Sequence, residues 1–163
     1  LNKLTRYASV APVLASANFS TGLNVLLALV SQASRALASA EIEITETHHR
    51  YKKDAPSGTA IALGEAAANA RGTTLEQVAC YGRNGESGTR APATIALHAL
   101  RMGQVVGDHT VHLAESGETL TLSHSATHRS TFADGAIRAA KWLAGRDAGQ
   151  YTMAQMLGLE PEG

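Results

Sequence analysis

Apolar and polar residues alternate from residue 41 to residue 47, and this segment constrains the fold of the chain most strongly. A period of two places successive side chains on opposite faces of a strand, so we expect a strand with one face covered. Two histidines, His48 and His49, follow at its C-terminal end. A loop with Pro and Gly then leads into an Ala-rich segment at 59–71, which stops at Gly72, the residue type preferred just past a helix end. The sequence thus predicts a strand, a polar loop and a helix in succession.

Further segments with clear periodicity flank this unit. Helical spacing of apolar residues predicts helices at 22–39, behind Ser20 and Thr21 as candidate caps, at 132–144, closed by Gly145, and in a short patch from Thr152 to Leu157. Strands are predicted at 8–15, 94–100, 105–113 and 118–123. The last three are separated by short turns and are expected to pair as an antiparallel meander, after a loop at 81–92 rich in Gly, Asn and Ser. This order of elements predicts an α+β fold with a mixed, largely antiparallel sheet flanked by helices.

Composition excludes several classes of protein. Fourteen Lys and Arg balance fourteen Asp and Glu, so there is no basic excess to attract a phosphate backbone and no nucleic-acid partner is expected. The single cysteine, Cys80, excludes an internal disulfide framework and favours a reducing, cytoplasmic compartment. The most apolar stretch, at 23–30, is far shorter than the roughly 20 residues that a membrane span requires. We therefore expect no membrane partner either.

Groups able to carry chemistry concentrate between the strand at 41–47 and the helix that follows it. A helix N-terminus exposes unpaired N–H groups, so the amides of Gly58 and Thr59 form a natural site for a carboxylate or phosphate. Lys52 and His49 can add donors to the same anion, and His48 carries an imidazole suited to passing a proton. From spacing alone, a solvated loop in front of a well-capped helix is an equal alternative.

The same segment carries a longer pattern, Glu-x-His-His-x-x-Lys-x-Asp-x-Pro-Ser-Gly-Thr-Ala, which is complete from Glu46 to Ala60. It resembles the signature of the dihydrodipicolinate reductase family, enzymes of lysine and diaminopimelate synthesis. Three further segments, at 16–24, 101–109 and 129–136, are similar to other motifs of that family. The resemblance therefore extends over nearly the whole chain.

Membership of this family would imply a reduction in which a hydride passes from NADPH or NADH to a small cyclic dicarboxylate, giving tetrahydrodipicolinate. By the resemblance, His48 donates or accepts a proton, Lys52 donates one, and His49, Gly58 and Thr59 hold a substrate carboxylate. The turn at 16–19 would contact the nicotinamide end of the cofactor through Ser16, Ala17, Asn18 and Phe19. The family also assembles as a homotetramer through the sheet of its second domain. Arg129 is left open between a contact in the domain cleft and a solvated helix start.

One expected part of the family is absent from the sequence. No Gly-rich turn of the Rossmann type occurs, and the glycines at 82, 85 and 88 neither follow a clear strand nor open a helix. The chain also lacks an initial Met, so we expect it to begin in mid-protein. The predicted organisation is the end of a cofactor domain at 1–20, a substrate-binding and tetramerisation domain at 21–130, and a helical return to the cofactor domain at 131–163. The isolated chain is then expected to bind cofactor poorly and to be an inactive substrate-binding and oligomerisation module of a reductase.

Seven histidines raise a third possibility, a metal site. His109 and His112 are three apart on a predicted strand and face opposite sides, which argues against joint ligation. His124 and His128 straddle a turn and can meet, but no paired thiolates or carboxylate set lies near them in the sequence. We therefore expect no metal.

Overall fold

A computed structural model describes residues 2–159 of the chain. It divides into two compact units, one comprising Leu26–Thr127 and the other formed by the residues up to Val25 together with those from His128 onward. Residue 1 and residues 160–163, with which the predicted first and last segments begin and end, lie outside the described range.

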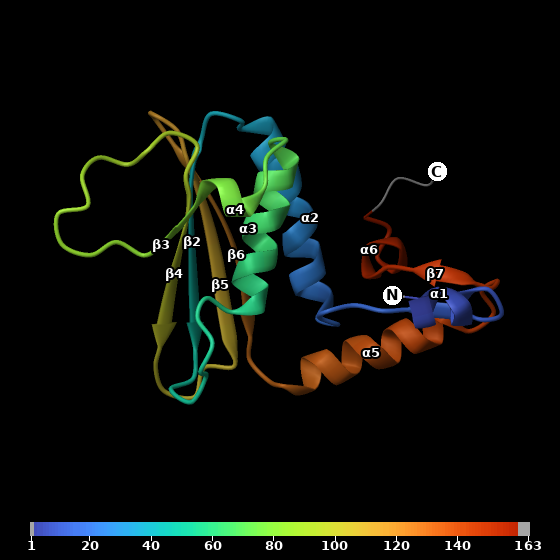
Figure 1. Cartoon of the computed structure of the whole chain (residues 1–163). Coiled ribbons are helices and arrows are strands. Elements are labelled where there is room, and N and C mark those ends of the chain that lie inside the picture. The colour runs from blue at the N-terminus through green and yellow to red at the C-terminus, as the bar shows by residue number, and fades with distance from the viewer. Residues whose placement is uncertain (1, 160–163) are drawn as a thin grey trace. The chain divides into compact units, whose positions relative to one another are not determined.

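The larger unit is built on a five-stranded mixed sheet (Figure 1). Its strands in spatial order are β3 (Ala79–Tyr81), β4 (Ile95–Arg101), β2 (Glu41–His48), β5 (Gly107–Ala114) and β6 (Thr119–Ala126). The central strand β2 is antiparallel to β5 and parallel to β4, while β6 pairs antiparallel with β5 and β3 pairs parallel with β4. The mixed sheet confirms the predicted α+β class.

The predicted meander is confirmed in its second pairing, since β5 and β6 are antiparallel neighbours, and wrong in its first. β4 and β5 are not neighbours, because β2 lies between them and bonds to both. The connection from β4 to β5 crosses the end of β2, where the N–H of Met102 donates to the carbonyl of His48 at 2.9 Å. The short turn at 101–104 predicts a hairpin, but alternation of residues indicates only which face of a strand is buried and not which strand lies beside it.

Helices cover one face of this sheet (Figure 1). They are α2 (Thr21–Ala36), α3 (Gly58–Ala70) and the short α4 (Leu75–Val78), which the sequence did not predict. The core between them consists of apolar side chains from both layers, including Val30, Ile42, Ile44, Leu63, Ile95, Leu97, Val111 and Leu113. Of the two candidate caps of α2, Ser20 is confirmed, since its Oγ accepts from Leu23 N–H at 3.3 Å, whereas Thr21 is the first residue of the helix. The predicted stop of α3 is confirmed as well, since the helix ends at Ala70 with Arg71 as its C-cap, before a left-handed Gly72 (φ 73°).

The smaller unit contains three helices and a pair of parallel strands among its described residues. These are α1 (Asn2–Ala8), β1 (Pro12–Leu14), α5 (Ser130–Leu143), β7 (Gly149–Tyr151) and α6 (Met153–Met156), with β1 pairing with β7. Neither α1 nor β7 was predicted. Thr152 caps α6 as expected, accepting from Gln155 N–H at 3.0 Å.

The apolar spacing that predicts α5 does not mark its buried face. Ile137, one of the residues at that spacing, is 55% exposed, whereas Gly135 and Ala139 are buried. Gly135 packs so closely on the backbone of Phe19 that an added Cβ would lie 1.8 Å from the Phe19 carbonyl oxygen. The buried face of this helix therefore includes two small residues, and the partly buried Trp142 packs against the core cluster to which Ala139 belongs. Within residues 2–159, none of the helices has both the length and the apolar character needed to cross a bilayer.

Candidate active site

Glu46 is the hub of a polar cluster at the end of the central strand. It follows Ile42 and Ile44 on the helix-covered face of β2, and its side chain is 0% exposed. The guanidinium of Arg101, on the neighbouring β4, binds both carboxylate oxygens at 2.9 Å. Burial alone would raise the pKa of the Glu46 carboxyl, but hydrogen bonds from Arg101, His48 and a backbone N–H together hold it below its ordinary value. Glu46 is therefore a buried, ionised group with a cationic partner.

The two carboxylate oxygens of Glu46 also connect the strand end to the start of α3. Oε2 lies 2.5 Å from Nδ1 of His48, the last residue of β2. Oε1 accepts the N–H of Ser57, the N-cap of α3, at 2.9 Å. One buried side chain thus fixes the predicted proton-exchanging imidazole and the predicted anion site relative to each other.

The first turn of α3 has the free donors that the sequence predicts. Ser57 Oγ accepts the N–H of Ala60 at 3.1 Å, and the Ser57 carbonyl accepts that of Ile61 at 3.0 Å. Within residues 2–159 the structure gives the N–H groups of Gly58 and Thr59 no acceptor, so these two donors remain for an external anion. A Cβ at Gly58 would meet nothing within 4 Å, which leaves the approach to this backbone open.

The loop between β2 and α3 carries the remaining predicted substrate residues. The Lys52 ammonium binds both oxygens of the Asp54 carboxylate, at 2.8 and 2.7 Å. Arg101 also donates to the carbonyl of Asp54 at 2.6 Å, which ties this loop to the Glu46 cluster. The His49 ring lies 6.2 Å from that of Tyr51. The cation expected to meet substrate is therefore paired with an exposed carboxylate of its own loop.

His109 supports the cluster from β5, although the sequence analysis assigned it no function. It is 4% exposed, its Nε2 lies 3.1 Å from Ser57 Oγ, and its ring meets that of His48 edge-on with centroids 5.1 Å apart. Burial, followed by the proximity of His48, lowers the pKa of His109 to about 4. Because Ser57 Oγ already accepts from Ala60, its hydroxyl proton is directed to a neutral His109 ring.

The turn predicted for the cofactor lies in the smaller unit, and its polar groups are largely used within the turn. Ser16 Oγ donates to the carbonyl of Asn18 at 2.8 Å, and that carbonyl also accepts from the Asn24 amide at 3.0 Å. Phe19 packs beside the core cluster of this unit. These bonds explain why serine and asparagine recur in the motif at 16–24, since they fix the turn.

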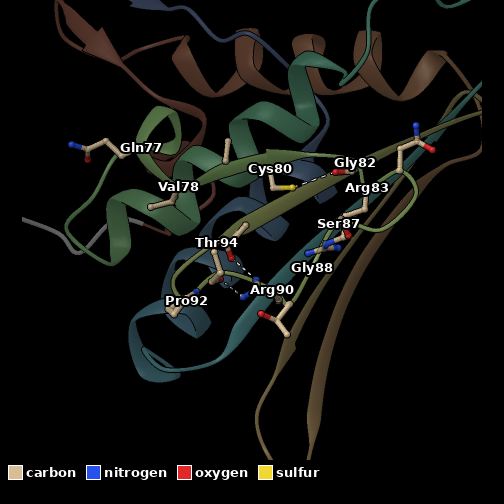
Figure 2. Close-up of a pocket in the computed structure, with 14 residues that line it drawn as sticks. Gln77, Val78, Cys80, Gly82, Arg83, Ser87, Gly88, Arg90, Pro92 and Thr94 are labelled. Atoms are coloured by element: carbon tan, nitrogen blue, oxygen red, sulfur yellow. Dashed lines mark hydrogen bonds between the residues drawn. The ribbon is translucent and has the colours of Figure 1, made fainter.

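The larger unit also contains a cavity outside the predicted site (Figure 2). A cavity of about 490 Å³ is lined by residues between Gln77 and Thr94, at the base of the loop that follows β3, and by none of the predicted site residues. Glu43 anchors this loop by binding Arg83 at 2.9 and 2.7 Å and Arg90 at 3.1 Å. The loop predicted at 81–92 is thus confirmed apart from Tyr81, which ends β3.

Comparison with known proteins identifies the group of enzymes to which these features belong. The family model described as dihydrodipicolinate reductase, C-terminus, matches residues 22–157. The chain belongs to the dihydrodipicolinate reductase family. Within that family, it is 54% identical over 149 residues to 4-hydroxy-tetrahydrodipicolinate reductase of Pseudomonas fluorescens (strain SBW25), covering 91% of this chain and 56% of the relative. It is 50% identical over 155 residues to the reductase of the same name from Halorhodospira halophila (strain DSM 244 / SL1), covering 94% of this chain and 58% of the relative.

A solved structure agrees with the family assignment at the level of fold. Dipicolinate-bound dihydrodipicolinate reductase from Paenisporosarcina sp. TG-14 superposes with a TM-score of 0.68 at 20% sequence identity, covering 87% of this chain and 53% of that one. The chain spans little more than half the length of the curated relatives it matches.

The residues that connect the site could not be assigned their roles from the sequence. In the sequence, Glu46 is only a fixed position of the motif at 46–60. Its place in the alternation of the strand, however, puts its carboxylate on the buried face, where it requires hydrogen-bond donors. Arg101 and His109 are likewise the two ends of the motif at 101–109, but their proximity to Glu46 depends on β4 and β5 both lying beside β2. In the described part of the chain no cluster of three or more metal-ligating side chains occurs.

Proposed function

We propose that this chain is the substrate-binding part of a 4-hydroxy-tetrahydrodipicolinate reductase, which reduces its substrate to tetrahydrodipicolinate in lysine and diaminopimelate synthesis. The observation that carries the proposal is the convergence at Glu46, which joins the His48 imidazole to the α3 start with its two free N–H groups. A small dicarboxylate suits such a place, because one of its carboxylates can take the amide donors while the ring faces the imidazole. The relatives named above carry the same activity in their names.

The substrate carboxylate would be held by the N–H groups of Gly58 and Thr59, with His49 and Lys52 adding further donors. The positive end of the α3 dipole favours the anion, and Gly58 lets it approach the backbone closely. Lys52 must exchange its present partner, Asp54, for the substrate. This exchange is inexpensive, because an exposed ion pair contributes little to stability.

Proton transfer would use His48 and Lys52. An ammonium beside the developing negative charge of the reduced substrate stabilises the transition state more than the ground state, as catalysis requires. Lys52 is then the proton donor to the substrate carbon, and His48 exchanges a proton at the same site. Replacement of Lys52 by Ala is expected to depress turnover of the full-length reductase more than it weakens substrate affinity.

NADPH or NADH, when bound, would supply the hydride. The turn formed by Ser16, Ala17, Asn18 and Phe19 is rigid enough to meet the nicotinamide end, with contacts from backbone groups and the Phe19 ring, since the Ser16 hydroxyl and the Asn18 side chain are engaged within the turn. Among residues 2–159 no Gly-rich turn follows a strand and opens a helix, so these residues fit only that end of the cofactor. The isolated chain should therefore bind cofactor weakly.

A second candidate function is that of a catalytically inactive module for substrate binding and assembly. The face of the sheet opposite the helices carries polar groups of three strands, including Glu43, Thr45, Thr110 and Ser123, and no described helix covers it (Figure 1). A homotetramer joined through this face, in the cytoplasm, fits both candidates. Light scattering separates assembly from a monomer, and a steady-state assay with NADPH separates an enzyme from a module.

Titration calorimetry of the 163-residue chain with pyridine-2,6-dicarboxylate tests the proposal. Saturable heat is expected with the wild-type chain, reduced in Lys52→Ala, whereas NADPH should give no micromolar binding. A folded chain that releases no heat with the dicarboxylate would contradict the substrate assignment. Micromolar affinity for NADPH would instead contradict the proposal that this chain contacts only the nicotinamide end of the cofactor.

A further inference from the structure

We propose that Glu46 is a positioning residue that, clamped by Arg101, holds the His48 imidazole with its proton on Nδ1 and leaves Nε2 as the nitrogen that exchanges a proton with a ligand. The tautomer follows from the contacts of the chain itself. Its use in catalysis rests on the function proposed above.

The Glu46 carboxylate accepts three hydrogen bonds from Arg101 and Ser57. Oε1 receives N–H donors from Arg101 and Ser57, and Oε2 receives one from Arg101. An ionised carboxylate only accepts hydrogen bonds, so the nitrogen of His48 that faces Oε2 must carry a proton. That nitrogen is Nδ1, at 2.5 Å.

Glu46 stays ionised although it is buried. Its side chain is fully buried, a position in which a lone carboxyl would take up a proton. Arg101 prevents this by binding both oxygens in a planar fork, the geometry for which a guanidinium is best suited. Arg101 is therefore the residue that makes Glu46 an acceptor and His48 a donor at Nδ1.

The His48 ring also has close neighbours on β5, at Gly107 and His109. A Cβ added at Gly107 would lie 3.0 Å from Nε2 of His48, so the ring lies beside β5 at a position where glycine leaves room for it. His109 packs edge-on against the ring and is neutral near pH 7, so it adds no charge there. The ring has little freedom to turn and exchange its two nitrogens.

A purely structural role for the pair of Glu46 and Arg101 makes a different prediction. Loss of a structural ion pair would lower the free energy of unfolding and leave the tautomer of His48 as it was. Glu46→Gln separates the two roles. With its oxygen placed toward Ser57 and Arg101, the amide nitrogen of Gln faces His48, where it can only donate.

The test is long-range ¹⁵N–¹H correlation spectroscopy of the histidine rings in the 163-residue chain near neutral pH. The neutral form of His48 in the wild-type chain is expected to carry its proton on Nδ1, and Glu46→Gln is expected to move the proton to Nε2. His98 provides a matched control, because its Nε2 lies 2.7 Å from Glu43 on the opposite face of the same sheet. The His98 signals should be unchanged in Glu46→Gln and should change in Glu43→Gln, with the reverse holding for His48.

The wild-type spectrum alone can overturn the inference, since a His48 protonated on Nε2 contradicts it even if Glu46→Gln fails to fold. A folded Glu46→Gln chain with an unchanged His48 tautomer contradicts it as well. Neither measurement involves substrate, so absence of dicarboxylate binding with the expected tautomers would contradict the proposed function and leave the role of Glu46 intact.

Discussion

Ser57 Oγ and His109 Nε2 lie 3.1 Å apart, which joins the cap of α3 to the strand β5 in the buried part of the site. The other ring nitrogen of His109 is buried without a hydrogen-bond partner within the described part of the chain. Protonation of His109 would remove the acceptor that Ser57 uses and place a charge in the core. This single contact therefore couples the shape of the anion site to pH.

His109 should make the stability of the chain depend on pH between about 6.5 and 4. Its pKa falls from an ordinary 6.5 to about 4 on folding, so in that window the unfolded chain binds a proton that the folded chain does not. The free energy of unfolding should be highest above 6.5 and fall as the pH drops toward 4, by a total on the order of 3 kcal/mol from this group. Urea unfolding across this range should show a smaller slope for His109→Gln than for wild type. Equal slopes would contradict the neutral buried state of His109.

Glu43 should make the stability of the chain depend on pH in a second, more acidic range. Hydrogen bonds from Arg83 first, and from His98 and Arg90 against the opposing effect of burial, lower the pKa of Glu43 to about 2. Because folding lowers the pKa of this carboxyl, Glu43 stabilises the fold fully above its ordinary pKa of 4.5. This stabilisation is lost as the pH falls toward 2. Acid unfolding followed by circular dichroism should be flatter over this range in Glu43→Gln than in wild type. If the two curves are parallel, the loop is not anchored through Glu43.

Asp54→Asn should strengthen dicarboxylate binding. The Asp54 carboxylate, 65% exposed, forms an ion pair with the Lys52 ammonium, the group that is proposed to bind the substrate. Removing this competitor should tighten binding of pyridine-2,6-dicarboxylate by roughly two- to fivefold, the range expected for an exposed ion pair. Calorimetric titration gives the affinity directly. Weaker binding in the variant would instead show that Asp54 helps to shape the site.

Gly58→Ala should separate binding from folding. An added Cβ has open space in the structure, and the backbone of Gly58 is not left-handed, so the free energy of unfolding should stay within about 1 kcal/mol of wild type. The same Cβ would block the approach of a carboxylate to the first turn of α3, so affinity for pyridine-2,6-dicarboxylate should fall at least roughly tenfold. Gly117→Ala, at another position where a Cβ meets nothing within 4 Å, is the matched control and should bind normally. Equal affinities of both variants would exclude the α3 start as the anion site.

Much of the site could be predicted from the sequence, because local chemistry defines it. The alternation at 41–47 fixed the strand that ends in His48, and Ser57 with Gly58 marked a helix start with free donors. These features depend on residues close together in the chain. The motif that resembles a known family lies within the same short stretch, which is why the sequence was sufficient to recognise it.

The connections between elements could not be predicted in the same way. Arg101 reaches Glu46 only because β4 runs parallel to β2, and the expected meander would have placed it elsewhere. His109 reaches Ser57 because β5 flanks β2 on the other side. Similarly, the buried face of α5 follows from the close contact of Gly135 with Phe19, which no periodicity of large apolar residues could indicate. Pairing order and close backbone contacts are properties of the assembled fold.

The most direct test of the central claim is a crystal structure of the chain with pyridine-2,6-dicarboxylate. The expected result is a carboxylate that accepts hydrogen bonds from the N–H groups of Gly58 and Thr59, with Lys52 turned from Asp54 toward the ligand. A ligand bound instead in the cavity beneath the loop between Gly82 and Thr94, or a vacant α3 start at saturating concentration, would contradict it.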